Sequence, residues 1–164
     1  MGLQLPGELV TFLSMIGYDW PQADETALVE MGQRWLAFSG TLQTLTAEAG
    51  QAAQPVGTGN AGADIEAFQR YWTEQDGPVQ VLQDGALAAT LAGTGLMVVA
   101  AIVLALKIQV IVQLVILGIQ IAQAVATAVA TFGATLAEIP IFQMITREIV
   151  GLLIDEVIGA LLDG

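Results

Sequence analysis

The sequence predicts an all-α fold: a helical bundle with an N-terminal antiparallel helical hairpin and one long, very apolar central helix. Two observations carry this prediction. Apolar side chains recur at spacings of three and four over most of the chain, which is the period of an α-helix. In addition, between positions 96 and 137 the only charge is Lys107, within a run of aliphatic residues, alanine and glycine. Such a run must be buried in protein or in lipid.

The chain is predicted to open with a short helix over residues 6–17. Pro6 is tolerated in the first turn of a helix, because the N–H that it lacks has no intrahelical partner there. Gly17 then ends the helix, since glycine readily adopts the left-handed backbone of a C-terminal cap.

Residues 24–54 and 61–91 form the two arms of the predicted hairpin. Each arm carries an apolar stripe, and helices joined by a short connection pack antiparallel. Asp24 is suited to cap the first arm, because its carboxylate accepts hydrogen bonds from the free amides of the first turn. Gly77–Pro78 predicts a kink or a short break in the second arm. We expect four aromatic residues of the two stripes to pack between the arms: Trp35, Phe38, Phe68 and Trp72.

The connection between the arms, residues 57–62, matches the nucleotide-binding pattern G-x-G-x-x-G. A dinucleotide-binding loop of this kind must follow a buried strand, whereas this segment follows the polar end of a helix. We therefore interpret it as a flexible helix-to-helix turn and expect no nucleotide cofactor.

A long apolar helix is predicted over residues 96–138, and a terminal helix over 141–162, with Pro140 ending or kinking the first. Many β-branched side chains favour strands, but the Gln residues recur at spacings of four, seven and three, which is helical. Such a helix is about 64 Å long, roughly twice the ~30 Å core of a bilayer, so a simple single span does not fit. Its polar residues fall on one stripe: Gln109, Gln113, Gln120, Gln123, Thr127 and Thr131.

The polar stripe leaves two interpretations open. In the first, it faces solvent or polar groups along the central helix of a soluble bundle. In the second, the helix opens out into a membrane and the stripe lines a watery path. Lys107 lies about 160° from the stripe, so in a pore it would point at lipid. That placement costs about 2.5 to 3.5 kcal/mol at a helix centre, and we therefore favour the soluble bundle for the resting state.

The composition excludes several classes of function. The net charge is −12, with four Lys and Arg residues against 16 Asp and Glu, whereas nucleic-acid binding needs a basic surface. With no His and no Cys, the usual nucleophile and general-base arrangements are missing. We expect no enzyme, no cofactor and no metal site. The N-terminus has no basic region ahead of an apolar stretch, so no general secretory signal peptide is expected.

Several segments together resemble a known family. Gly17-Tyr18-Asp19-Trp20-Pro21 is followed by Asp24, and the first arm carries Arg34-Trp35. The second arm carries Ala67-Phe68-Gln69-Arg70-Tyr71-Trp72, and glycines precede the long apolar helix. This layout resembles the N-terminal domain of actinobacterial CpnT-like polymorphic toxins, which are distantly related to the WXG-type helical hairpins of type VII secretion.

The resemblance implies a non-enzymatic secretion or delivery domain of a type VII-type polymorphic toxin, a single helical module whose toxic enzyme lies beyond Gly164. It also implies helical partner proteins or secretion machinery, and either export by a signal-peptide-independent route or a place in the cell envelope. The alternative is a pore-forming or membrane-translocation domain that uses the helix at 96–138 and its polar stripe, since a channel has been proposed for the mycobacterial relative. A homo-oligomer and a membrane-associated state are compatible with both hypotheses.

Overall fold

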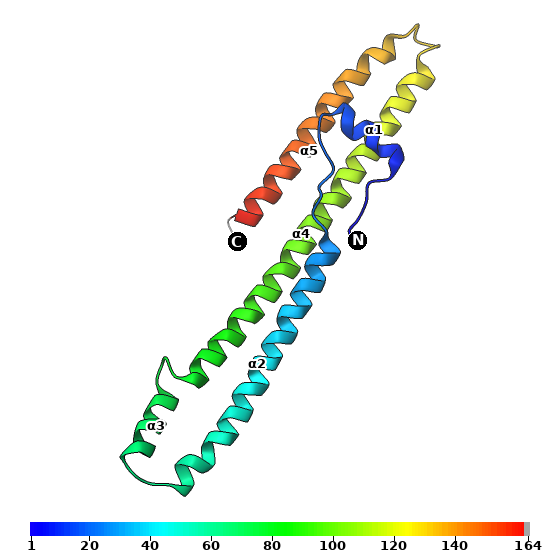
Figure 1. Ribbon diagram of the computed structural model, residues 1–164. Coiled ribbons are helices and arrows are strands. Elements are labelled where there is room, and N and C mark those ends of the chain that lie inside the picture. The colour runs from blue at the N-terminus through cyan, green and yellow to red at the C-terminus, as the bar shows by residue number, and fades with distance from the viewer. Residues whose placement is uncertain (163–164) are drawn as a thin grey trace. The chain divides into compact units, whose positions relative to one another are not determined.

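The computed structural model describes residues 1–162, which are 83% helical and contain no strand, so the predicted all-α fold is confirmed (Figure 1). The helical segments are α1 (Gly7–Met15), α2 (Glu25–Gly59), α3 (Ala63–Thr73), α4 (Pro78–Thr127), the short 3-10 helix η1 (Ala134–Glu138) and α5 (Ile139–Leu162).

The chain divides into two compact units. Unit 1 comprises Met1–Ala27 with Val99–Gly164, and unit 2 comprises Leu28–Val98. Unit 1 therefore contains α1, the second half of α4 and α5, whereas unit 2 contains most of α2, all of α3 and the first part of α4.

The apolar helix begins earlier than the predicted range of 96–138. α3 ends at Thr73, the predicted break follows it, and α4 starts at Pro78, where the missing N–H of proline breaks no hydrogen bond. From there the helix continues without interruption into the apolar segment, so the predicted separation of the second arm from the apolar helix is wrong. Gly93 stays helical because it packs against Gly32 of α2, and it does not serve as a turn.

The same helix also ends earlier than predicted. α4 stops at Thr127, and Phe132 and Gly133 adopt left-handed backbone conformations with φ of 52° and 84°, which an α-helix does not accommodate. The N–H of Gly133 donates to the carbonyl of Ala128 at 2.7 Å and closes this turn. Pro140 lies in the first turn of α5, so it helps to begin a helix and does not end one.

α2 extends through Pro55 to Gly59, beyond its predicted end at residue 54. Most of the glycine-rich connection is therefore helical, and the turn before α3 begins only after Gly59. The reason is tertiary packing, because the Gln69 amide of α3 lies against the backbone of Gly57. The stacked rings of Phe68 and Trp72, 5.4 Å apart, line a hollow beside the same end of α2.

Small residues allow α2 and α4 to approach closely within unit 2. A Cβ atom placed on Gly32 would lie 2.7 Å from the carbonyl oxygen of Gly93, which no real Cβ contact permits. Further along, the buried Ser39 hydroxyl donates to the Ala86 carbonyl at 2.7 Å and lies 2.8 Å from the Thr90 hydroxyl. The seam of this hairpin therefore combines glycine, serine and threonine with larger side chains, such as Leu36, which lies against Gly93.

This seam changes the expected role of the four hairpin aromatics. Trp35 and Phe38 are 40% and 49% exposed, and their rings meet edge to face at 6.1 Å. Gly32, Leu36 and Ser39 occupy the face of α2 toward α4, and Trp35 and Phe38 lie on a different face of the helix. The aromatics form two separate pairs, one on the outer face of α2 and the other, Phe68 with Trp72, between α3 and the end of α2.

The core of unit 1 forms where α1 packs against α4 and α5. The ring of Phe12 lies over Gly118 of α4, and the hydroxyl of Tyr18 lies over Gly151 of α5. Glycines at these two positions let α1 and the turn after it sit close to both longer helices. The buried core residues are Leu13, Ile16, Leu106, Val110, Leu114, Leu117 and Val150.

Two glycines of α2 provide a matched test of the close approach. Gly32→Ala is expected to lower the free energy of unfolding, because the new methyl group forces α2 away from α4. Gly40→Ala, which meets nothing within 4 Å, is expected to raise it by about 0.5–1 kcal/mol through helix propensity. Urea unfolding of both variants measures the difference, and equal stabilisation by the two changes would contradict the glycine seam.

Candidate functional site

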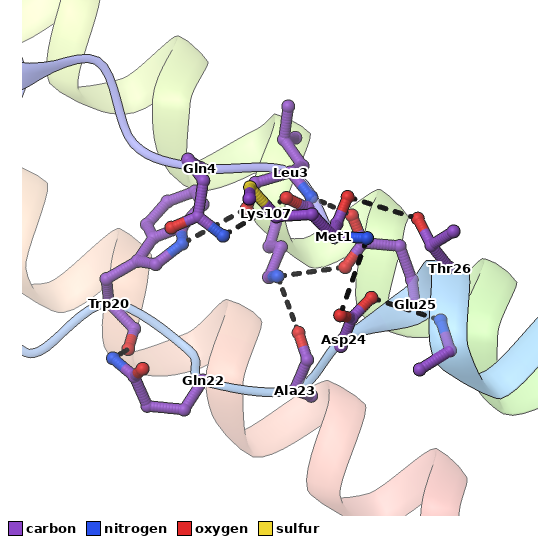
Figure 2. A network of polar contacts seen from close by, with 12 residues as sticks. Met1, Leu3, Gln4, Trp20, Gln22, Ala23, Asp24, Glu25, Thr26 and Lys107 are labelled. Carbon is purple, nitrogen blue, oxygen red and sulfur yellow. Dashed lines mark hydrogen bonds and ion pairs between the residues drawn. The ribbon is translucent and has the colours of Figure 1, made fainter.

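The only lysine of the chain is buried in the middle of its most apolar helix. Lys107 is 1% exposed, and its ammonium group donates hydrogen bonds to the carboxylate of Glu25 at 2.8 Å and to the carbonyl of Ala23 at 2.6 Å (Figure 2). The ammonium also lies 5.7 Å from the ring centroid of Trp20, within the range of a cation–π contact. A charge in such surroundings is stable only when it is paired and hydrogen-bonded, and here both conditions are met.

The N-terminal segment closes this site from the other side. The backbone N–H of Leu3 donates to the second carboxylate oxygen of Glu25, and the indole of Trp20 donates to the carbonyl of Leu3 at 3.3 Å (Figure 2). Gly2 is buried, and a Cβ atom there would lie 2.5 Å from the Glu25 carboxylate. Glycine at position 2 therefore has a packing reason, because any side chain would displace the carboxylate from Lys107.

Asp24, next to this pair, acts as the predicted helix cap. Its carboxylate accepts the N–H of Ala27 at 3.0 Å, and this hydrogen bond lowers the pKa of Asp24. The amino group of Met1 lies 3.7 Å from the same carboxylate, and the Thr26 hydroxyl donates to the Met1 carbonyl. The neighbouring carboxylates Asp24 and Glu25 thus have different roles, one capping α2 and the other neutralising Lys107.

The contacts with Leu3 and Lys107 lower the pKa of the Glu25 carboxyl group. Burial alone raises its pKa, but the Leu3 N–H, the Lys107 hydrogen bond and the Lys107 charge together lower the pKa from 4.5 to about 2. Because the folded-state pKa lies below the ordinary value, ionised Glu25 stabilises the fold above pH 4.5. This contribution is lost as the pH falls toward 2.

The Lys107 site is shielded from solvent, because Lys107 is 1% exposed and Glu25 is 7% exposed. Its polar atoms are used by the protein itself, so its action is structural: it fixes the N-terminal segment and the first turn of α2 onto α4. Among residues 1–162 there is also no group of three or more acidic, His or Cys side chains that could hold a metal ion.

The predicted polar stripe is distributed over several environments. Gln109 and Gln123 are exposed, whereas Gln113 and Gln120 are half-buried. The hydroxyls of Thr127 and Thr131 donate to backbone carbonyls one turn earlier, at 2.9 and 3.1 Å. Because α4 ends at Thr127, Thr131 falls outside the helix, so the structure does not join the six residues into one helical stripe.

Sequence reasoning missed the apolar surfaces that the fold leaves open. The described residues include one helical segment, Ala63–Thr127, that is long and apolar enough to cross a membrane, yet only 28% of its most apolar 18-residue stretch is buried. One face of this run therefore forms the core of unit 1, through Leu106, Val110, Leu114 and Leu117, whereas its other faces are left exposed. Exposed aliphatic side chains along this half of α4 include Ile108, Val112, Val115, Ile116 and Ile119.

A second apolar surface lies on the outer face of α2, in unit 2. Met31, Trp35, Phe38 and Leu45 lie on one stripe of the helix and are all exposed, whereas Leu42, between the last two, is half-buried. Met31, Arg34, Trp35 and Phe38 line a shallow hollow on this face. The periodicity at spacings of three and four identified this stripe in the sequence, but it did not distinguish an inward from an outward face.

These features define an all-α protein with a close-packed helical hairpin. The model of the family described as "WXG100 like domain" matches residues 4–148, and the chain belongs to this family. No curated protein and no solved structure matches the chain. The family consists of secreted helical proteins that are not known as enzymes and that typically pair with helical partners. Membership of this family associates the chain with type VII secretion.

The buried ion pair can be tested against an exposed pair of the same chain. Lys107→Met or Glu25→Gln is expected to lower the free energy of unfolding by about 3–5 kcal/mol, because each leaves one buried group uncompensated. The double variant is expected to lose clearly less than the sum of the single losses. Arg34→Met and Glu30→Gln, which remove an exposed pair, should each change stability by about 0.5 kcal/mol or less. Additive losses in urea unfolding of the buried pair would contradict the coupling.

Proposed function

We propose that this chain is the N-terminal delivery domain of a toxin exported by type VII secretion, and that a helical partner protein docks on the outer face of α2. The observation that carries this proposal is the exposed stripe of Met31, Trp35, Phe38 and Leu45. The family to which the chain belongs typically pairs with helical partners. The toxin itself would lie beyond Gly164, outside the described residues.

The stripe has the dimensions and chemistry of a helix-binding face. Its residues follow one another at spacings of four, three and seven, so they form a line about 21 Å long on one side of the helix. Exposed Trp and Phe side chains are typical anchors of protein interfaces, because they bury a large area at a small cost in conformational entropy. The exposed Arg34 lies beside them, where it is available to an acidic side chain of a partner.

The close approach of α2 and α4 supports this interpretation. Gly32, Leu36 and Ser39 make the contacts with α4, so the aromatic pair Trp35 and Phe38 remains exposed. An exposed stripe of this kind is costly in water, and burying it against a second apolar helix removes that cost.

The partner face is tested by co-expressing the chain with candidate small helical proteins and measuring their capture. Trp35→Asp with Phe38→Asp is expected to weaken capture of such a partner by about 30-fold or more, because it places two charges in an apolar interface. Leu87→Asp with Leu91→Asp, on exposed positions of α4 in the same unit, provides the matched control and should leave capture unchanged. Equal capture by both variants would contradict docking on α2, and failure of the full chain to be exported by type VII secretion would contradict the delivery role.

The second candidate function, a pore-forming or translocation domain, is favoured by the exposure of the apolar half of α4. In that function α4 inserts in a membrane and the Gln side chains line the path of ions. Gln113→Leu with Gln120→Leu is then expected to reduce conductance in planar bilayers severalfold, whereas Gln80→Leu with Gln83→Leu, near the start of α4, should not. Unchanged conductance in the first variant would exclude lining by this face.

A further inference from the structure

The apolar half of α4 carries two separate stripes on opposite faces of the helix. The first stripe is buried and contributes Leu106, Val110, Leu114 and Leu117 to the core of unit 1. The second stripe, which we call the heptad stripe, consists of exposed positions that lie roughly 170° away around the helix. Its members are Ala101, Ala105, Ile108, Val112, Val115, Ile119, Ala122 and Ala126.

The heptad stripe has the spacing of a coiled coil. From Ala101 to Ala126 its positions follow one another in alternating steps of four and three residues, which is the a/d pattern of a heptad repeat. The four large side chains at its centre are between 42% and 54% exposed: Ile108, Val112, Val115 and Ile119. This pattern fits the knobs-into-holes packing of a second helix. A lipid phase requires apolar surface but no such period, because the hydrophobic effect is non-directional.

The heptad stripe is also symmetric about its midpoint, which lies between Gln113 and Leu114. Read from that point in either direction, the stripe presents valine, isoleucine, alanine and alanine. When two copies of α4 run antiparallel with their midpoints together, Val112 of one copy lies opposite Val115 of the other. Ile108 lies opposite Ile119 in the same way, and the alanines at the two ends meet alanines. The stripe is therefore complementary to itself, as an interface with two-fold symmetry requires.

The charges of the chain permit this pairing. The net charge is −12, so two copies repel each other over most of their surface. From Ile108 to Ala137, however, the sequence contains no ionisable side chain, and Lys107 is buried against Glu25. The exposed Gln109 and Gln123 flank the stripe, and their amide groups both donate and accept hydrogen bonds. The heptad stripe is thus a surface where two acidic chains meet without like charges facing each other.

We propose that two copies of the chain associate in water through the heptad stripe, as an antiparallel pair of α4 helices related by a two-fold axis at the midpoint. The contact spans about 38 Å of each helix. Each copy presents the same surface to the other, so the pair is closed and does not grow into a filament. This inference concerns unit 1 alone, uses a different surface from the outer face of α2, and depends on neither the delivery role nor a pore.

The absence of cysteine allows a direct test of the register, because single cysteines can be introduced at chosen positions of the stripe. The full chain with Ile108→Cys is mixed with a tagged full chain with Ile119→Cys and treated with a short bis-maleimide. We expect the two variants to be cross-linked, because the antiparallel register places these positions opposite each other. Ile108→Cys alone should give no product, since its two copies then lie about 17 Å apart along the helix axis, beyond the reach of the reagent.

The oligomeric state is measured by sedimentation of the full chain in detergent-free buffer at several concentrations, and a two-chain species is expected. Val112→Asp with Val115→Asp should raise the dissociation constant of the pair by about 100-fold or more, because carboxylates of both copies then meet in one apolar contact. Ile145→Asp with Leu152→Asp, on exposed positions of α5 in the same unit, adds the same charge and should leave the pair intact. Circular dichroism confirms that both double variants are folded.

Any of four results overturns the inference. The first is a single-chain species at every concentration, which would leave the heptad stripe to a helix of another protein. The second is equal association of the two double variants. The third is efficient cross-linking of Ile108→Cys with itself, which would show a parallel pair. The fourth is flotation of the unmodified chain with phosphatidylcholine vesicles, which would show that lipid covers this face.

Discussion

The fold of unit 1 depends on the neutralisation of one charge. An ammonium group in the middle of an apolar helix is tolerated only with a carboxylate beside it, and Glu25 supplies that carboxylate from a segment more than eighty positions earlier. Because Glu25 also begins α2, the same contact determines where this helix starts against α4. The N-terminal residues then complete the site through a backbone N–H and through the space that a missing side chain leaves.

The distribution of small and large side chains determines how closely the helices pack within each unit. Glycine and serine at the inner face of α2 bring two helices into near-backbone contact, and the aromatic residues of the same helix are left outside. In unit 1, Phe12 of α1 lies over Gly118 of α4, and Tyr18, just after α1, lies over Gly151 of α5. The nine-residue helix α1 and the turn after it therefore pack against both longer helices. The chain thus combines close backbone packing with an aliphatic core in unit 1, and many of its large apolar residues remain exposed at the surface.

The sequence predicted the class of fold and the existence of most helices, because the period of apolar residues is a local property. It also identified the cap at Asp24 and the break before Pro78. It did not predict that α4 passes through Gly93 or ends at Thr127, since a glycine in a helical pattern is compatible with both a turn and a close contact. Lys107 was recognised as anomalous, but choosing Glu25 among 16 acidic residues requires the tertiary fold. For the same reason, the stripe of Trp35 and Phe38 was found, whereas its outward direction was not.

The burial of Lys107 has a consequence for how the chain is cut. A protease that cleaves only after lysine has a single site in this sequence, between Lys107 and Ile108, and that site is helical and closed by Glu25 and Trp20. Proteolysis there requires local opening of the helix, so the rate of this one cut follows the population of opened molecules. The rate of cleavage after Lys107 therefore reports how often this part of α4 opens.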